Sequence, residues 1–437
     1  MYRLVSRLIL YKDEDSILFN LAKIFRKYDL SKKDFDIRYE TISQINSEVG
    51  RIVELASKYG FSGDLWHDYL IYLLLSSENS LCVMFERCES GENLTIDEFM
   101  RNDLEVIVEL MNYDFSAIED ELGINSFSMI RNFTQSSSFD YSNHNASGLI
   151  CDVCSKVKAG CSVDELYSVI RNFYHKYGVG IYGLNKAFKL SHSNGDDFSI
   201  VPITSFDDSI SLDDLLGYEY QKGALVDNTE AFIRGCKANN VLLYGDAGTG
   251  KSTSIKAILN KYYDDGLRII EVYKHETKYL SRIISEIKDR NYFFILYMDD
   301  LSFEESESDY KYLKALIEGG LEITPDNILI YATSNRRHLV RETWNERSDT
   351  SAETDLYHSD TVREKLSLVD RFGITIGYYK PTFNEYVDIV ISLARRYPEI
   401  TLTDEELESE AKIWIRTHGH PSGRTAEQLV YYLLGKC

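Results

Sequence analysis

A strand-like run followed at once by a glycine-rich loop constrains this chain more than any other segment. Residues 241–252 read Val-Leu-Leu-Tyr-Gly-Asp-Ala-Gly-Thr-Gly-Lys-Ser, and residues 253–263 favour a helix. Gly-x-x-x-x-Gly-Lys-Ser is a phosphate-binding loop, in which backbone N–H groups and the helix N-terminus face a polyphosphate. We expect Lys251 to reach the terminal phosphates and the Ser252 hydroxyl to ligate Mg²⁺. The loop residues expected to contact a nucleotide are Gly245, Gly248, Thr249, Gly250, Lys251, Ser252 and Thr253.

Length and charge narrow the class of protein. A chain of 437 residues has room for two or three domains. Its net charge of −22 argues against a dominant nucleic-acid or anionic-membrane surface, although it leaves room for a local basic groove. No apolar run approaches the ~20 residues of a membrane span, and seven cysteines do not form a disulfide scaffold. We therefore expect a cytoplasmic protein with reduced thiols and no membrane partner.

The hydropathy pattern divides the chain into three parts. Residues 1–205 carry helical periodicity and end in a polar linker at 192–213, which runs into the second part. Residues 206–380 alternate strand-like and helical runs, a pattern typical of a parallel sheet with helices on both faces. Residues 381–437 read as three helices without a strand. The five strand-like runs are 241–244, 268–272, 292–298, 327–333 and 374–376.

Polar side chains follow two of these runs. Asp299 and Asp300 end the run at 292–298, and Asn335 follows the run at 327–333. The carboxyl ends of parallel strands share one edge of a sheet, so these side chains should lie beside the phosphate-binding loop. We expect Asp299 to help hold Mg²⁺, Asp300 to polarise an attacking water, and Asn335 to contact that water or the γ-phosphate. The alternative is a pair of polar turns after buried strands.

The order of motifs resembles that of AAA+ ATPases: Walker A, Walker B, sensor 1, arginine finger and sensor 2. It is similar above all to a bacterial AAA+ family described only as a domain of unknown function with ATP binding. The resemblance covers the chain from about residue 212 to the C-terminus. The segments that carry it are 212–219, 229–232, 239–245, 299–304, 313–322, 332–339, 364–373 and Ser422-Gly-Arg424.

This resemblance implies a fold and several roles. It implies an AAA+ P-loop core with a five-stranded parallel sheet and a C-terminal helical lid, preceded by a mostly helical N-terminal domain. It places Leu216, Gly217 and Tyr218 beside the adenine. It makes Arg371 the finger that reaches a neighbouring subunit's γ-phosphate, and it places Arg424 over the phosphates of its own subunit. The alternatives are a domain-packing salt bridge for Arg371 and a surface charge for Arg424.

Two features depart from the family pattern. An Asp-Asp pair replaces the usual Asp-Glu pair, so the candidate base is one methylene shorter. The segment after the run at 268–272 reads Tyr-Lys-His-Glu, which is not a pore-loop pattern and disfavours a threading translocase.

Three weaker signals remain open. Cys151, Cys154, Cys161 and His144 form a candidate zinc set, with helix-buried thiols as the favoured alternative. A basic cluster at 336–341, with Arg347, favours a subunit interface facing the acidic segment 304–309 over nucleic acid. Residues 347–360 are expected to form a polar surface loop.

The combined prediction is an AAA+ ATPase that uses ATP and Mg²⁺. We expect ATP-dependent homo-oligomers and a protein client recruited by the N-terminal domain. A helicase-loader-like factor in DNA transactions is one alternative, and a non-hydrolysing ATP-dependent switch is another, kept open by the Asp-Asp pair. A small-molecule kinase is disfavoured by the helical segment that carries Arg424.

Overall fold

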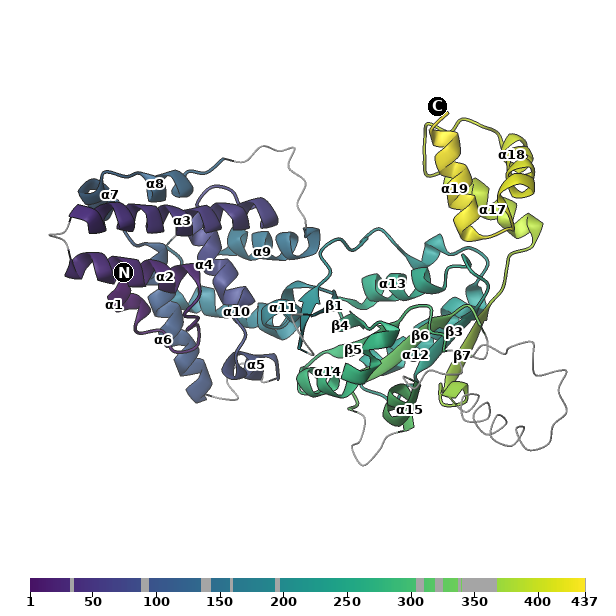
Figure 1. The fold of residues 1–437 in the computed structure, drawn as a ribbon, viewed down its shortest axis with the longest axis horizontal. Helices are drawn as coiled ribbons and strands as arrows, with labels where there is room; N and C mark the ends of the chain where they lie inside the picture. Colours follow the sequence, from purple (N-terminus) through teal and green to yellow (C-terminus); the bar gives the residue numbers. More distant parts are fainter. Residues whose placement is uncertain are drawn as a thin grey trace. The chain divides into compact units, whose positions relative to one another are not determined.

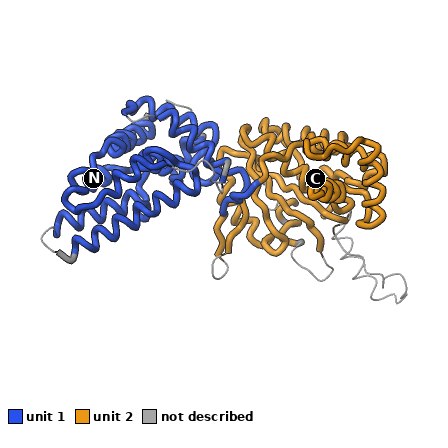
Figure 2. Tube along the Cα trace, turned by 90° about the horizontal axis from the view of Figure 1, so that it is seen from above, with its two compact units in different colours: residues 1–187, 201–206 blue, residues 188–200, 207–437 orange. Residues whose placement is uncertain are grey.

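The chain divides into two compact units in a computed structural model (Figure 2). The first comprises Met1–Ala187 and Val201–Phe206, and the second comprises Phe188–Ile200 and Asp207–Cys437. The structure describes residues 1–31, 35–87, 94–134, 143–157, 160–192, 197–303, 310–318, 325–336, 339 and 368–436. Among these residues, no helix combines the length and the apolar character needed to cross a bilayer.

The first unit is helical. Capping side chains define several helix starts: Ser16 accepts a hydrogen bond from the Phe19 N–H, and Ser162 and Glu165 form a reciprocal capping box. The described helices are α1 (Tyr2–Val5), α2 (Ile17–Leu30), α3 (Phe35–Tyr59), α4 (Leu65–Ser76), α5 (Ser80–Arg87), α6 (Leu94–Met111), α7 (Ser116–Leu122), α8 (Ser126–Arg131), α9 (His144–Lys156), α10 (Val163–Lys176) and α11 (Gly180–Leu184).

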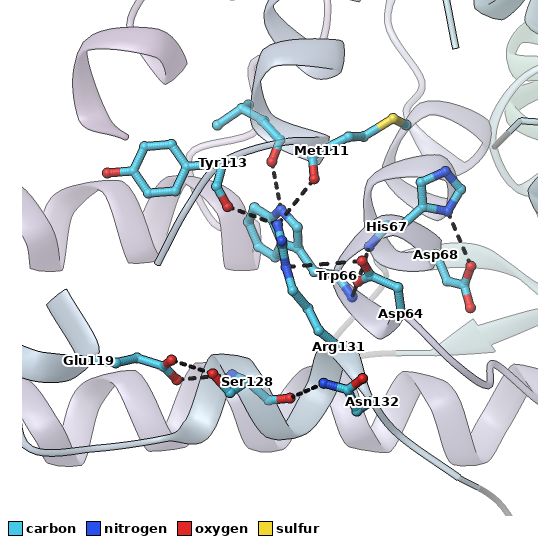
Figure 3. Close-up of polar contacts among 11 residues, drawn as sticks. Asp64, Trp66, His67, Asp68, Met111, Tyr113, Glu119, Ser128, Arg131 and Asn132 are labelled. Carbon is cyan, nitrogen blue, oxygen red and sulfur yellow. Dashed lines mark hydrogen bonds and ion pairs between the residues drawn. The ribbon is translucent and has the colours of Figure 1, made fainter. Parts of the chain in front are cut away.

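Polar contacts tie neighbouring helices of this unit together (Figure 3). The Trp66 indole N–H donates to the Leu110 carbonyl at 2.8 Å. The Arg131 guanidinium donates to the carbonyls of Met111 (3.1 Å) and Tyr113 (2.8 Å), which satisfies the end of α6 from α8. Each of these contacts joins a side chain to a backbone carbonyl of another helix or of the segment after it. They therefore stabilise the packing of the helices in this unit.

The second unit is built on a seven-stranded sheet with the order β2-β1-β4-β5-β6-β3-β7. The pairs β4–β5, β5–β6, β6–β3 and β3–β7 are parallel. In Figure 1, α13 lies on one side of the sheet and α14 and α15 lie on the other. The elements are β1 (Ala187–His192), β2 (Phe198–Pro202), η1 (Leu212–Asp214), α12 (Glu219–Ile233), β3 (Val241–Gly245), α13 (Lys251–Tyr262), β4 (Leu267–Glu271), η2 (Lys274–Tyr279), α14 (Leu280–Ile287), β5 (Phe293–Met298), α15 (Tyr310–Glu318), β6 (Ile328–Ser334) and β7 (Ile374–Tyr378).

The predicted fold class is confirmed, with two strands more than the five expected. The five predicted runs form the parallel part of the sheet, and β1 and β2 extend it beyond β4. β2 lies within the polar stretch interpreted as a linker. Phe198 and Ile200 are buried there and Ser199 between them is exposed, and this alternation allows a short strand to form in a polar segment.

Three helices with reciprocal capping boxes end the chain: α17 (Phe383–Ala394), α18 (Asp404–His418) and α19 (Gly423–Leu434). Tyr386, Leu407 and Leu429 are fully buried among them, and Leu216 packs against the same cluster. This small helical subdomain, the lid, thus has its own core and contacts the segment before α12.

Candidate functional site

The loop between β3 and α13 adopts backbone angles that favour glycine. Gly245 and Gly250 have φ values of 134° and 92°. A Cβ at Gly245 would lie 1.8 Å from the Tyr378 carbonyl oxygen, and one at Gly250 would lie 2.4 Å from a methyl of Leu215. The two glycines therefore let the loop pass close to β7 and to the segment before α12.

Lys251, the first residue of α13, turns back onto this loop. Its Nζ donates to the carbonyls of Gly245 (2.9 Å) and Asp246 (2.7 Å), and to Asn335 Oδ1 (3.1 Å). Only 7% of the residue is exposed. Burial lowers the pKa of the Lys251 ammonium, although the carboxylates of Asp300 and Asp246 act in the opposite direction. The ammonium thus occupies a polar recess beside the carboxyl ends of β3 and β6.

Three hydroxyl groups converge on one oxygen of Asp299. Its Oδ1 accepts hydrogen bonds from Thr333 Oγ1 (2.5 Å), the Tyr297 hydroxyl (2.6 Å) and Ser252 Oγ (2.8 Å). Desolvation raises the pKa of the Asp299 carboxyl, but the hydroxyl donors outweigh it and the pKa lies below its usual value. The site therefore holds Asp299 ionised next to the hydroxyl of Ser252.

Asp300 and Asn335 form a second contact across the ends of β5 and β6. Asn335 Nδ2 donates to Asp300 Oδ1 at 2.7 Å, so one amide side chain contacts both Asp300 and Lys251. The Asp300 N–H donates to Thr333 Oγ1 at 2.9 Å. Asp300 has a φ of 49°, in the left-handed region that aspartate enters more readily than most residues.

A cavity of about 1010 Å³ brings most of the predicted site residues together. The predicted residues that line it are Leu216, Tyr218, Gly248, Thr249, Gly250, Lys251, Ser252, Thr253, Asp299, Asp300, Asn335 and Arg424. Gly217, Gly245 and Arg371 do not line it. Gly245 nevertheless shapes the loop through its backbone angle and supplies a carbonyl to Lys251.

The lid closes one side of this cavity. The Arg424 N–H donates to the Gly248 carbonyl at 3.4 Å, which joins the start of α19 to the glycine-rich loop. Arg396 forms a 2.7 Å ion pair with Asp214 of η1. These contacts and the packing of Leu216 hold the lid over the cavity.

Several cavity residues have no motif that marks them in the sequence. Most of them come from the segment before α12 and from the lid, where polar and apolar residues resemble ordinary surface and helix positions, whereas Ala247 lies in the glycine-rich loop and Thr333 lies in β6. The cavity residues that were not among the predicted site residues are Asp207, Ser209, Ile210, Asp214, Leu215, Ala247, Thr333, Ile389, Leu393, Arg396, Tyr397, Gly423, Glu427, Val430 and Tyr431.

Tyr218, one of the residues expected to border adenine, contacts the end of β7 and the residue that follows it. Its hydroxyl donates to the Tyr379 carbonyl at 2.8 Å, and its ring centroid lies 5.1 Å from that of Tyr378. Gly217 has a φ of 81° and sits between the two lining residues, so it sets the turn without lining the cavity.

Arg371 lies near the opposite edge of the sheet from the glycine-rich loop. It precedes β7, whose first residue, Ile374, pairs with Val241, whereas its last residue pairs with Gly245. Four residue steps along a parallel strand span about 13 Å. Its place before β7 therefore separates Arg371 from the cavity of the same chain.

The structure describes only some of the residues in the candidate zinc set, the basic cluster and the polar loop. Cys151 Sγ donates to the Tyr59 carbonyl at 3.8 Å, and burial raises the pKa of the Cys154 thiol. Among the described side chains, Cys151, Cys154 and Cys161 do not form a metal-binding group, and the side chain of His144, the fourth member of the candidate set, lies outside the described residues. Three other predicted features lie wholly or partly outside the described residues: the acidic segment 304–309, residues 337, 338, 340 and 341 of the basic cluster, and the loop 347–360.

A protein-family model and one curated protein match parts of this chain. The model of a protein of unknown function, DUF815, matches residues 184–437. The replication factor C large subunit of Methanococcus vannielii is 38% identical over 74 residues, which are 17% of this chain and 15% of that protein.

Solved structures resemble about half of the chain. The Thermotoga maritima RuvB Holliday junction branch migration motor is similar at 19% identity and a TM-score of 0.35, over 51% of this chain and 64% of that one. The FIGL-1 AAA domain in complex with ADP is similar at 17% identity and a TM-score of 0.38, over 53% of this chain and 75% of that one. The family match spans more than half of the sequence, and the chain therefore belongs to the DUF815 family.

Proposed function

We propose that this chain is an AAA+ ATPase that binds ATP with Mg²⁺ and hydrolyses it. One observation carries the proposal: a single cavity joins Lys251, the Ser252–Asp299 pair and the Asp300–Asn335 pair. A phosphate-binding ammonium, a hydroxyl–carboxylate pair and a second carboxylate with an amide partner are the groups that phosphoryl transfer from a nucleotide requires.

The residues present suit both ligands. The cavity volume, about 1010 Å³, lies at the upper end of the range for small-molecule sites. Ser252 Oγ and the ionised Asp299 supply hard oxygen donors, which Mg²⁺ prefers. Bound Mg²⁺ would neutralise phosphate charge beside these two residues.

The chain's own residues have separate roles in this proposal. Lys251 exchanges its carbonyl partners for phosphate oxygens, and a charge-assisted contact of this kind contributes about 1.5–3 kcal/mol. Asp300 accepts a proton from the attacking water, and Asn335 orients that water or Asp300. Arg424 on the lid adds a cation on the side of Gly248.

Arg371 acts in trans in the proposed assembly. Its place before β7, away from its own cavity, suits contact with the γ-phosphate of a neighbouring subunit. We propose that ATP promotes homo-oligomers and that the helical first unit recruits a protein client. The net charge of −22 favours a protein client over nucleic acid.

The test is ATP turnover by Asp300→Asn beside ATP binding by the same variant. The amide cannot take up the proton, so we expect turnover to fall about 10²–10⁴-fold while affinity stays within a few-fold of wild type. Asp264→Asn, at an exposed turn after α13, is the matched control and should leave both unchanged. Wild-type turnover by Asp300→Asn would place the base elsewhere. A wild type that binds ATP without turnover would favour the non-hydrolysing switch.

A further inference from the structure

Two imidazoles and a carboxylate meet where β1 ends. His192 is the last residue of β1, and His275 and Glu276 belong to η2, which follows β4. One ligand atom from each residue lies within 4.8 Å of the other two. His192 Nε2 and Glu276 Oε1 are 2.7 Å apart. None of the three residues lines the cavity proposed for ATP.

The carboxylate of this group is held in place. Glu276 is 2% exposed, and its Oε2 accepts a hydrogen bond from the Tyr273 N–H at 2.8 Å. Glu276 therefore keeps Oε1 directed toward His192, and the backbone donor orients it as an outer-shell partner orients a metal ligand.

The two imidazoles are exposed and are bordered by aromatic rings. The rings of Tyr273 and His275 are nearly parallel, with centroids 6.0 Å apart, and Tyr279 lies 5.6 Å from the His192 ring. A hydrogen bond between His192 and Glu276 explains two members of the group. It does not explain the second imidazole, which makes no hydrogen bond with a described residue.

We propose that His192, His275 and Glu276 form a site for a divalent transition metal of the Zn²⁺ class, with water as the fourth ligand. Ligand atoms on a tetrahedral zinc ion lie about 3.3 Å apart, given metal–ligand distances of about 2.0–2.1 Å. The exposed imidazoles reach this spacing from the observed distances by small rotations. Two imidazoles select Zn²⁺ over Mg²⁺, which prefers oxygen ligands. The bound ion fastens η2 to β1 and so fixes the segment that leaves β4.

Zinc titration of the untagged, metal-free full chain in millimolar Mg²⁺ tests this site. We expect one Zn²⁺ per chain by calorimetry, and Co²⁺ should give the visible absorption bands of a tetrahedral complex. His192→Ala and His275→Ala should each weaken Zn²⁺ binding at least tenfold and abolish the Co²⁺ bands. Both side chains are exposed, so circular dichroism of the metal-free variants should match wild type.

Two controls separate this site from others. His175→Ala removes an exposed imidazole from α10 and should leave Zn²⁺ binding unchanged. Lys251→Ala should also bind Zn²⁺ normally, so failure of the ATP proposal and failure of this one remain distinguishable. Absence of Zn²⁺ binding by the wild type, or wild-type affinity in both His192→Ala and His275→Ala, would overturn the proposal.

Discussion

A single carboxylate oxygen organises the proposed magnesium site. Asp299 Oδ1 accepts three hydroxyl donors, from α13, β5 and β6. Such donors stabilise the ionised carboxylate, and they position it without adding a charge of their own. Thr333 stands out because the same hydroxyl oxygen that donates to Asp299 also accepts the N–H of Asp300. One threonine thus fixes both acidic residues.

Thr333→Val should weaken the magnesium site while keeping the side-chain shape. The change removes a donor from Asp299 and leaves the Asp300 N–H without its partner, which costs about 1–3 kcal/mol of unfolding free energy. We expect Mg²⁺-dependent ATP affinity to fall several-fold. Thr375→Val on β7, where the side chain is exposed, should change neither quantity, as urea unfolding and nucleotide titration will show. Equal losses of stability and of ATP affinity in Thr333→Val and Thr375→Val would show that Thr333 has no particular role in the site.

Some of the residues around Asp299 and Asp300 could be predicted from the sequence, and others could not. Asp299, Asp300 and Asn335 follow apolar strands, so strand-end chemistry pointed to them. Tyr297 and Thr333 lie inside apolar runs, where a hydroxyl is inconspicuous until strand pairing brings it to a carboxylate. Asn335 is the predicted polar contact, yet Thr333 takes part as well: Asn335 contacts Asp300, and Thr333 contacts both Asp299 and Asp300.

Two glycines of the second unit should respond in opposite ways to replacement by alanine. Gly250→Ala would place a Cβ 2.4 Å from Leu215 at a φ of 92°, so we expect loss of stability and of ATP binding. Gly223 lies inside α12 with no atom within 4 Å of an added Cβ. Gly223→Ala should therefore stabilise the chain by about 0.5–1 kcal/mol. Thermal unfolding of both variants measures this contrast, and a stabilised Gly250→Ala would contradict the loop geometry.

The parallel sheet was predictable because its five strand-like runs alternate with helical segments. β1 and β2 were harder to predict because they are short and lie in or beside a polar stretch. Their place in the sheet depends on pairing beside β4, which is a tertiary contact that local patterns do not encode. Apart from Arg424, the lid residues that line the cavity were missed for the same reason, since Arg396 meets Asp214 only in the folded unit.

The position of Arg371 predicts that ATP turnover depends on assembly of several copies of the chain. Fingers in related phosphoryl-transfer systems contribute roughly 10³–10⁵ in rate, so Arg371→Ala should nearly abolish turnover while ATP binding persists. Mixing Arg371→Ala with Lys251→Ala should restore part of the activity, because mixed assemblies pair an intact site with an intact finger. Arg416→Ala, exposed on the lid, serves as the control. If the chain stays monomeric and its turnover rate does not depend on protein concentration, Arg371 does not act as a finger, and the domain-packing salt bridge is the better explanation.

ATP binding by this chain should depend on Lys251, and nucleotide titration of Lys251→Ala measures that dependence. Lys256→Ala, an exposed lysine on the same helix, is the matched control and should bind ATP as the wild type does. Loss of the charge-assisted contact to the β/γ-phosphates predicts at least a tenfold weaker affinity for Lys251→Ala. Unchanged ATP affinity in Lys251→Ala would show that the nucleotide does not bind through this ammonium group.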